Sequence, residues 1–402
     1  MKITIAGAGI GGLTAALCLH EKGFDVQVFE AVDRLQPLGV GINVMPHGSG
    51  VLHGLGLGAK LDEMAIRTRA IEYRTKYGHL IQSDPRCVEA GYEFPQYSVH
   101  RGELQFMLLD AVRERLGPDA VLCGKAATGF KQDGDGVEAS FSDGTSTRSD
   151  LLIGADGFRS VVRRQLHPEE GPAHYEGTMM WRGACERAQF GDGRTMFIAG
   201  DHDVKFVCYP ISGRLAAEGK ALVNWLAEVR HDQPRAAEDA DWTREGDRSF
   251  VPNYDDFRMA DIDIHELFDR TERVTVYPMI DRDPLDWWTD GRVTLLGDAA
   301  HPMYPIGANG ASQAIIDART LADCLAAMPG PGGLQEYESV RRPVTTKVVL
   351  SNRQSGPERV LDIAASRLKG PDDRIEDLVT AEELDEVASG YRQLAGFTKK
   401  IA

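Results

Sequence analysis

The stretch Lys2-Ile-Thr-Ile-Ala6, followed by Gly7-Ala-Gly9-Ile-Gly-Gly12, decides the fold of this 402-residue chain. Lys2–Ala6 predicts a buried strand, because this short apolar run is followed directly by glycine. Leu13–Gly23 predicts a helix that a glycine ends. Asp25–Phe29 predicts a second strand, which closes on Glu30. Strand, glycine turn, helix and strand in this order indicate an α/β fold with a parallel sheet.

The glycines of this turn have the spacing of a dinucleotide-binding loop. Gly7 allows the tight turn, Gly9 lets the backbone approach a pyrophosphate, and Gly12 lets the helix pack against the strand. The start of the helix offers free N–H groups and a partial positive charge to the phosphates. Glu30, 23 residues after Gly7, stands where a carboxylate accepts hydrogen bonds from ribose hydroxyls. The alternative is a glycine turn without a ligand, and the loop alone does not separate FAD from NAD.

Two distant segments repeat the pattern of a strand that ends at an aspartate. Asp150–Arg163 predicts a buried strand that runs into Asp156-Gly157 and a helix start. Gly291–Pro302 predicts an apolar strand that ends at Gly297-Asp298. Since ligands of open α/β sheets bind at the carboxyl ends of strands, an aspartate there can accept the hydroxyls of a polyol chain. The loop Met303–Ser312 then opens a helix, whose N–H groups suit an anionic ring.

Together, the motifs Gly7–Gly12, Asp156-Gly157 and Gly297-Asp298 resemble the single-component FAD-dependent aromatic hydroxylases of the para-hydroxybenzoate hydroxylase superfamily, over roughly residues 1–355. The resemblance implies an α/β protein, α+β overall. A Rossmann-like FAD-binding domain would carry an inserted, mostly antiparallel β-sheet substrate domain and a C-terminal helical segment. Further stretches are similar to the phenazine hydroxylases of pyocyanin biosynthesis, namely Pro37–Asn43, Pro95–Ser98, His100–Gln105, Trp181–Gly183 and Tyr277–Leu285.

The resemblance implies cofactor contacts for the loop and strand-end positions Gly7, Gly9, Ile10, Gly11, Gly12, Glu30, Ala31, Gly41, Arg101, Ala127, Asp156, Asp298, Gly307, Gly310, Ala311 and Ser312. By the same resemblance, the first loop and Glu30 hold the ADP half of FAD. Arg101 would contact the phosphate–ribityl region, and Asp298 would bond the ribityl chain. Gly307–Ser312 would lie beside the pyrimidine edge of the ring, and Asp156 belongs to a motif that serves both FAD and NAD(P)H.

Some of these assignments have competing interpretations. Asn309 and Ser312 stand where many family members carry Gln and Asn, so backbone contacts to the ring are expected there rather than side-chain contacts. Arg101 is alternatively a surface charge, because the segment from Glu103 to Gly117 has the pattern of an amphipathic helix. His301 is interpreted as a structural turn residue rather than a catalytic one. No histidine has metal-ligand spacing, so no metal is expected.

Four segments are expected along the chain: a first part of the FAD-binding domain at 1–171, a β-sheet substrate domain at 172–285, a second part of the FAD-binding domain at 286–355, and a helical segment at 356–402. The second segment loses the strand–helix rhythm and is rich in β-forming runs. Its sheet would cover the flavin and exclude water. The expected substrate contacts are Tyr209, Met303, Tyr304 and Pro305, with Trp225 and Met279 as further candidates for the pocket wall.

The acidic composition argues against several partners. With 61 Asp+Glu against 45 Lys+Arg, the net charge is −16, so nucleic acid or an anionic membrane is not expected as the main partner. The apolar run Ile3–Leu19 contains four glycines and no clear cleavage site, which favours strand, turn and helix over a signal peptide. Six scattered cysteines form no C-x-x-C pair, which favours reduced thiols in a cytoplasmic protein.

The resemblance implies an FAD-dependent monooxygenase that consumes NADH or NADPH and transfers one oxygen atom of O₂ to an aromatic or N-heteroaromatic ring through a flavin C4a-hydroperoxide. A phenazine carboxylate that loses its carboxylate is the implied substrate, and a phenol, a quinolone or another heterocycle fits the same sequence. A flavin-dependent halogenase would carry a W-x-W-x-I-P stretch, which this sequence lacks. A NAD-dependent dehydrogenase would leave both aspartate motifs unused. A flavin-binding module without turnover is the remaining alternative, and no oligomeric state is assigned.

Overall fold

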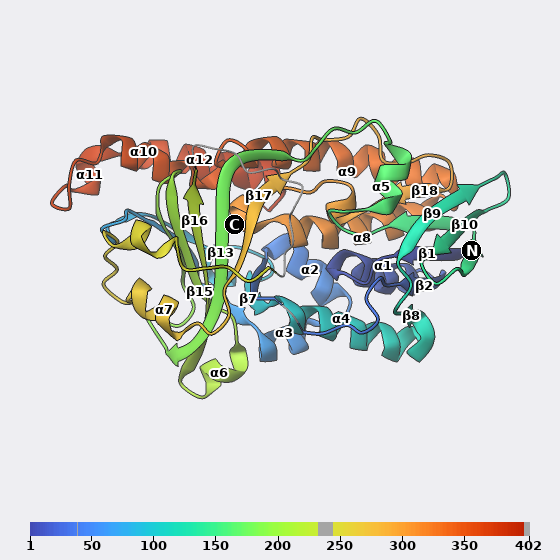
Figure 1. Cartoon of the computed structure of the whole chain (residues 1–402), viewed down its shortest axis with the longest axis horizontal. Coiled ribbons are helices and arrows are strands. Elements are labelled where there is room, and N and C mark those ends of the chain that lie inside the picture. Colours follow the sequence, from blue (N-terminus) through green and yellow to red (C-terminus); the bar gives the residue numbers. More distant parts are fainter. Residues whose placement is uncertain (38, 232–243, 398–402) are drawn as a thin grey trace.

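The computed structural model describes residues 1–37, 39–231 and 244–397, and a five-stranded sheet lies at one end of it (Figure 1). Its strand order is β18 (Val293–Leu295), β12 (Leu151–Gly154), β1 (Lys2–Ala6), β2 (Asp25–Phe29) and β8 (Val121–Leu122). All neighbouring strands run parallel. The predicted α/β unit is therefore confirmed, with helix α1 at Ile10–Glu21.

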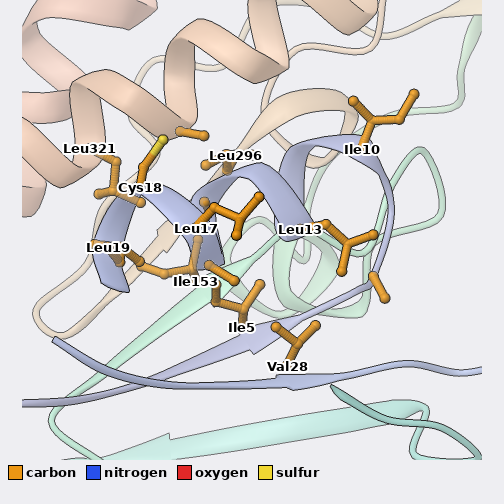
Figure 2. Close-up of a cluster of buried hydrophobic side chains, with 14 of the residues drawn as sticks. Ile5, Ile10, Leu13, Leu17, Cys18, Leu19, Val28, Ile153, Leu296 and Leu321 are labelled. Carbon is orange, nitrogen blue, oxygen red and sulfur yellow. The ribbon is translucent and has the colours of Figure 1, made fainter. Parts of the chain in front are cut away.

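Helix α1 lies at the centre of the largest core. It packs against β1 and β2, and against helices α4 (Arg101–Leu116) and α8 (Gly310–Ala327). Figure 2 shows Leu13 and Leu17 of α1 between the apolar side chains of the sheet and those of the neighbouring segments. Since every residue from Leu13 to Leu19 is buried, the glycine turn at the start of α1 is anchored by the core.

Smaller elements complete this half of the molecule. One antiparallel sheet has the order β11 (Ser146–Ser149), β10 (Val137–Phe141), β9 (Ala127–Gln132), and another has the order β3 (Gly41–Val44), β7 (Tyr97–His100), β4 (Ile66–Arg67). The helices are α2 (Pro46–Gly54), α3 (Gly58–Met64), α5 (Val161–Leu166) and α9 (Pro331–Asn352). Helix α9 packs on α8, and α2 packs beside the start of α8.

A seven-stranded sheet forms the other half of the molecule (Figure 1). Its order is β17 (Thr275–Asp281), β13 (His174–Ala188), β16 (Lys220–Arg230), β15 (Val204–Pro210), β14 (Met196–Gly200), β5 (Ala70–Arg74) and β6 (Leu80–Pro85). Neighbours are antiparallel except β14 and β5, which run parallel. Five of these strands lie within residues 172–285, and β5 and β6 come from residues 70–85.

The two faces of this sheet bury different side chains, because neighbouring residues of a strand point to opposite faces. Trp225 lies on the outer face, where its indole donates a hydrogen bond of 2.8 Å to Thr271 Oγ1 and packs against Phe250 and Phe268. The outer face is covered by helix α7 (Ile264–Arg270), and α6 (Gly213–Ala217) lies at the end of β16. The expectation that Trp225 lines the pocket is therefore wrong.

The chain ends in helices α10 (Arg359–Arg367), α11 (Ile375–Leu378) and α12 (Ala381–Ala395), as the predicted helical segment requires. Helix α10 packs against β5, β6 and β14 of the seven-stranded sheet, and α12 packs on α9 (Figure 1). Thr380 and Glu383 form a capping box that starts α12. Residues 398–402 of this predicted segment lie outside the described residues. Within the described ranges, no helix combines the length and apolarity needed to cross a membrane.

Candidate functional site

One cavity of about 1270 Å³ joins the two halves of the molecule. Its wall runs from Gly9 and Gly11, at the start of α1, past Arg101 and Asp298 to the inner face of the seven-stranded sheet. Single-ligand pockets typically have volumes of about 300–1000 Å³. This cavity is therefore large enough for a dinucleotide cofactor portion and an aromatic substrate together.

The glycine turn has a distinct steric demand at each glycine. Gly7 has φ +106°, and a Cβ there would lie 2.3 Å from the Ala155 carbonyl oxygen. A Cβ at Gly12 would lie 2.0 Å from the Gly7 carbonyl oxygen, whereas a Cβ at Gly9 would meet no atom within 4 Å. Gly9, Ile10 and Gly11 line the cavity. Packing thus requires glycine at Gly7 and Gly12, whereas Gly9 leaves open space beside the cavity.

The start of α1 has the features of an anion site. Gly9 is its N-cap residue, no side chain caps the helix, and its first turn carries no acidic residue. The first N–H groups of a helix have no partner within the helix and carry a partial positive charge. Because these donors open onto the cavity, they fit the pyrophosphate of a dinucleotide.

Glu30, Ala31 and Ala127 lie together beyond this turn, outside the wall of the large cavity. The Glu30 carboxylate accepts hydrogen bonds from the N–H groups of Ala8 (2.7 Å) and Val32 (3.1 Å). Strand β9 begins at Ala127, and two residues earlier the Lys125 N–H donates to the Glu30 carbonyl at 2.8 Å. The three positions thus cluster around the end of β2, where an adenosine ribose would meet a carboxylate.

Asp156 caps helix α5 and does not line the cavity, although Ala155 and Gly157 do. Its carboxylate accepts from Ser160 Oγ at 2.5 Å and from the Val161 N–H at 2.7 Å. Burial raises the pKa of Asp156, while these hydrogen bonds oppose the rise. In the structure, the Asp156 carboxylate therefore stabilises the start of α5, and its contact with FAD and NAD(P)H stays a prediction.

The guanidinium of Arg101 and the carboxyl group of Asp298 both lie at the middle of the cavity. Both line its wall and keep accessible surface there. Burial raises the pKa of Asp298, and the positive charges of His301 and Arg101 oppose the rise. Burial also lowers the pKa of Arg101, which Asp298 counteracts. A carboxyl group and a guanidinium at this place suit ribityl hydroxyls and a phosphate, and the contact of Arg101 with the cofactor stays a prediction.

His301 lies in a buried network of charged and polar groups, which supports its interpretation as a structural residue. It is 3% exposed, and its Nε2 lies 2.5 Å from Asp317 Oδ2, which also accepts from the Gly297 N–H at 3.1 Å. The other oxygen of Asp317 accepts from Arg341 Nε at 2.7 Å. Burial alone would raise the pKa of Asp317, but His301 and Arg341 lower it to about 2. This network fixes the segment that carries Asp298 onto helices α8 and α9.

The start of α8 provides a second uncapped helix terminus on the cavity. Gly307, Gly310 and Ala311 line the wall, and the first turn of α8 has neither a side-chain cap nor an acidic residue. Ser312 does not reach the cavity, because its Oγ accepts a hydrogen bond of 2.8 Å from the Met45 N–H. The N–H groups at the start of α8 therefore lie where the resemblance places the pyrimidine edge of the flavin ring.

The substrate end of the cavity is mostly apolar. Gly41 of β3, a predicted cofactor contact, also lines the cavity. The wall at the substrate end contains the four expected contacts Tyr209, Met303, Tyr304 and Pro305, and also Met279, Ile198 and Val207. These side chains come from alternate positions of strands β14, β15 and β17 and from the loop before α8. Apolar side chains of this kind fit an aromatic ring.

Sequence reasoning missed the charged residues of this end, among them Arg182. Its guanidinium donates to Tyr277 Oη at 3.1 Å and to the Gly41 carbonyl at 2.5 Å. Alternation along β13 could have flagged Arg182, since Met180 on the same face also lines the cavity. The face that a strand turns inward, however, is not visible without knowing its neighbours.

A buried triad of charges also borders the cavity. Lys205 Nζ lies 2.8 Å from Glu228 Oε2 and 2.5 Å from Glu358 Oε2. Burial raises the pKa of Glu228, and the Lys205 ammonium opposes the rise. Because Glu358 is more than a hundred residues from both partners in the sequence, no local pattern predicts this cluster.

Comparisons with known proteins agree with this geometry. A family model described as an FAD binding domain matches residues 1–352. The phenazine 1,6-dicarboxylic acid hydroxylase of Lysobacter antibioticus is 44% identical over 361 residues, which cover 87% of this chain and 89% of that protein. The 3-amino-4-hydroxybenzoate 2-monooxygenase of Streptomyces cremeus is 36% identical, over 87% of this chain and 85% of that protein. Among solved structures, a variant of Klebsiella pneumoniae HpxO complexed with FAD has a TM-score of 0.76 at 25% identity, over 98% of this chain and 94% of that chain.

The fold, the uncapped helix starts and these similarities define the class of protein. The chain belongs to this FAD-binding family and is an FAD-dependent aromatic monooxygenase. NADH or NADPH and O₂ are the co-substrates expected for the family. The prediction of an aromatic hydroxylase superfamily member is confirmed.

Proposed function

We propose that this monooxygenase acts on a phenazine carboxylate and replaces a ring carboxylate by a hydroxyl group. The continuous cavity carries the proposal, because it joins the cofactor end to apolar side chains on the sheet. The 44% identity to a protein named for phenazine 1,6-dicarboxylic acid supports the choice of ring. In this reaction the bond from the ring to the carboxylate breaks, a bond to oxygen forms, and CO₂ leaves. NADH or NADPH supplies two electrons, and the second oxygen atom leaves as water.

The chain's own residues would bind and orient the reactants. The N–H groups at the start of α1 would hold the pyrophosphate, and Asp298 would accept hydrogen bonds from the ribityl hydroxyls. The N–H groups at the start of α8 would stabilise negative charge at the edge of the ring. Bound FAD supplies the oxygen-activating chemistry, while the protein supplies position and exclusion of water. Met303 and Tyr304, on the loop before α8, would contact the substrate ring.

The test is NADH oxidation by the FAD-loaded protein with and without phenazine-1-carboxylate, followed by the mass of the product. We expect faster oxidation and a product that has lost CO₂ and gained one oxygen atom. Benzoate, which carries a carboxylate on one smaller ring, is the control for a response to any aromatic acid. No acceleration with protein that is fully loaded with FAD would contradict this choice of substrate.

The proposal also covers the location of the protein in the cell, its division into domains and its partners. A cytoplasmic location is supported by the six cysteines, all of which are free thiols in the structure. A division at residues 171, 285 and 355 is supported by the five strands of the seven-stranded sheet that lie between residues 172 and 285 and by the terminal helices, while β5 and β6, from residues 70–85, also join that sheet. On the net charge of −16, we expect no binding to nucleic acid. Cell fractionation and limited proteolysis test the location and the division.

A further inference from the structure

The loop before α8, at residues 303–309, has a strained backbone. Gly307 has φ +70° and Ala308 has φ +51°, so both lie in the left-handed region. In the part of the chain that the structure describes, Ala308 and Ser355 are the two residues other than glycine with a positive φ. A left-handed backbone costs free energy in a residue that has a side chain. Contacts from neighbouring segments must therefore hold this loop.

One of these contacts joins the loop to the segment that follows α9. The Gly307 N–H donates to Glu358 Oε1 at 3.2 Å. Glu358 ends a short 3₁₀-helix, and its own N–H donates to the Ser355 carbonyl at 2.8 Å. The two strained residues, Ala308 and Ser355, therefore lie on the two sides of the same hydrogen bond. Strained residues persist where the surrounding structure fixes them, and they cluster at functional sites.

Glu358 is itself fixed by a buried ion pair. Its Oε2 lies 2.5 Å from Lys205 Nζ, and its side chain is 7% exposed. Lys205 belongs to β15 of the seven-stranded sheet and also lies 2.8 Å from Glu228 Oε2. Donors thus engage both oxygens of Glu358, one from the sheet and one from the loop. The Glu358 carboxylate therefore fixes the loop relative to the sheet.

Two further contacts hold the same loop from the end of the chain. Asn352 Nδ2 donates to the Tyr304 carbonyl at 3.0 Å, and Asn352 Oδ1 accepts from Tyr391 Oη at 3.1 Å. A Cβ at Gly307 would lie 2.3 Å from Tyr391 Oη, so the loop packs closely against α12. The loop is thus held at Tyr304 and at Gly307, and Glu358 provides the charged contact.

The loop contributes to both ends of the cavity. Tyr304 lines the substrate end, and Gly307 lines the cofactor end. Helix α8 begins at Gly310 with N–H groups that no side chain caps. Since only residues 308 and 309 separate Gly307 from this helix, a shift of Gly307 would move the loop that leads into these donors.

We propose that Glu358 is a positioning residue for the flavin. It holds the loop at Gly307, and the loop places the N–H groups at the start of α8 beside the edge of the ring. This rests on the contact between α8 and the ring in the proposed function. The terminal helical segment then completes the cofactor end of the cavity, and no chemical step depends on Glu358.

The test titrates the apoprotein with FAD, followed by flavin fluorescence, and records the visible absorbance spectrum of the loaded protein. E358A should weaken FAD binding by about tenfold and shift the flavin absorbance bands, because the donors beside the ring move. E358Q keeps one of the two acceptor oxygens, so its affinity should lie between those of the native protein and E358A. E228Q is the matched control: Glu228 is as buried as Glu358 and pairs with the same lysine, but Gly307 donates to Glu358. Its FAD affinity should stay within about twofold of the native value.

A double variant tests whether Glu358 acts through the loop. G307A places a Cβ against Tyr391 Oη in a left-handed backbone, and alone it should weaken FAD binding by about tenfold. If Glu358 acts through Gly307, G307A/E358A should bind FAD within about twofold of G307A. Independent effects would instead multiply.

Three results would overturn the inference: native FAD affinity and spectrum in E358A, an equal loss in E228Q, or multiplied losses in the double variant. If E358A does not fold, E358Q decides, and native affinity in E358Q would overturn the inference. Native affinity in G307A would remove the proposed contact of α8 with the ring, and the inference with it. An error in the proposed substrate is separate, because no substrate enters this test.

Discussion

The two ends of the cavity are built in different ways. The cofactor end consists largely of backbone N–H groups, glycines and the strand-end aspartate Asp298, within short contiguous motifs such as Gly7–Gly12 and Gly297-Asp298. The substrate end consists of alternate side chains from several strands, such as Ile198 of β14 and Tyr209 of β15. A site made of backbone is insensitive to most side-chain changes, whereas a site made of side chains can change its ligand by single substitutions. This difference explains how the members of one family can share a cofactor and still act on many different substrates.

The largest effect expected at the cofactor end concerns Asp317, the buried anchor beneath it. D317N would leave His301 and Arg341 without their anionic partner, at a cost of about 3–5 kcal/mol in the free energy of unfolding. Urea unfolding at pH 7 measures this cost. D323N, a change at a half-exposed position of the same helix, is the control and should cost less than about 1 kcal/mol.

The comparison of the native protein with D317N also predicts how the free energy of unfolding depends on pH. His301 and Arg341 outweigh burial and lower the pKa of Asp317 from 3.8 to about 2. A carboxyl with a lowered pKa in the folded state stabilises the fold above its unfolded pKa, and that stability is lost as the pH falls through the folded pKa. The difference in unfolding free energy between the native protein and D317N should therefore shrink between pH 4 and pH 2. A difference that is constant over this range would contradict the ionised state of Asp317.

The next effect concerns FAD binding. D298A should weaken it by about 1.5–3 kcal/mol, because the ribityl hydroxyls lose a charged acceptor. Titration of the apoprotein with FAD, followed by flavin fluorescence, measures the affinity. D256A, at an exposed aspartate, serves as the control. Unchanged affinity in D298A would remove the aspartate from the cofactor end.

Two glycine variants sharpen the distinction between fold and ligand within one loop. G12A should destabilise the apoprotein by about 1–3 kcal/mol, because the new Cβ would lie 2.0 Å from the Gly7 carbonyl oxygen. G9A should leave apoprotein stability unchanged and weaken FAD binding by about 1 kcal/mol or more, since its Cβ enters only the cavity. Melting of the apoprotein and FAD titration separate the two effects. Equal behaviour of both variants would contradict the assigned roles.

The smallest effects distinguish the two faces of the seven-stranded sheet. M279A removes an apolar contact from the cavity wall and should weaken substrate binding by about tenfold, with the flavin affinity unchanged. W225F loses the hydrogen bond to Thr271 on the outer face, so stability should fall by about 1 kcal/mol while substrate affinity stays the same. Substrate titrations of both variants check the assignment, and a substrate effect in W225F larger than that in M279A would reverse it.

The sequence predicts the cofactor end better than the substrate end, for a physical reason. Gly9 and Asp298 are indicated by the turn and the strand end that they occupy, which are local features of the sequence, whereas Arg101 is assigned only by the resemblance to the family. Trp225 was expected in the pocket and lies on the outer face, because the inward face of a strand depends on its neighbours. The buried pair of Lys205 and Glu358 gives no local signal, since the two residues are 153 positions apart in the sequence.

The central claim is that one cavity holds FAD at the glycine turn and an aromatic substrate at the sheet. The most direct test is single-turnover product analysis under isotopically labelled O₂, with the FAD-loaded protein, NADH and phenazine-1,6-dicarboxylate. The account predicts a hydroxylated product that has lost one carboxylate, keeps the other and contains one labelled oxygen atom. NADH consumed to labelled hydrogen peroxide, with the phenazine recovered unchanged, would contradict the claim that this substrate reacts in the cavity.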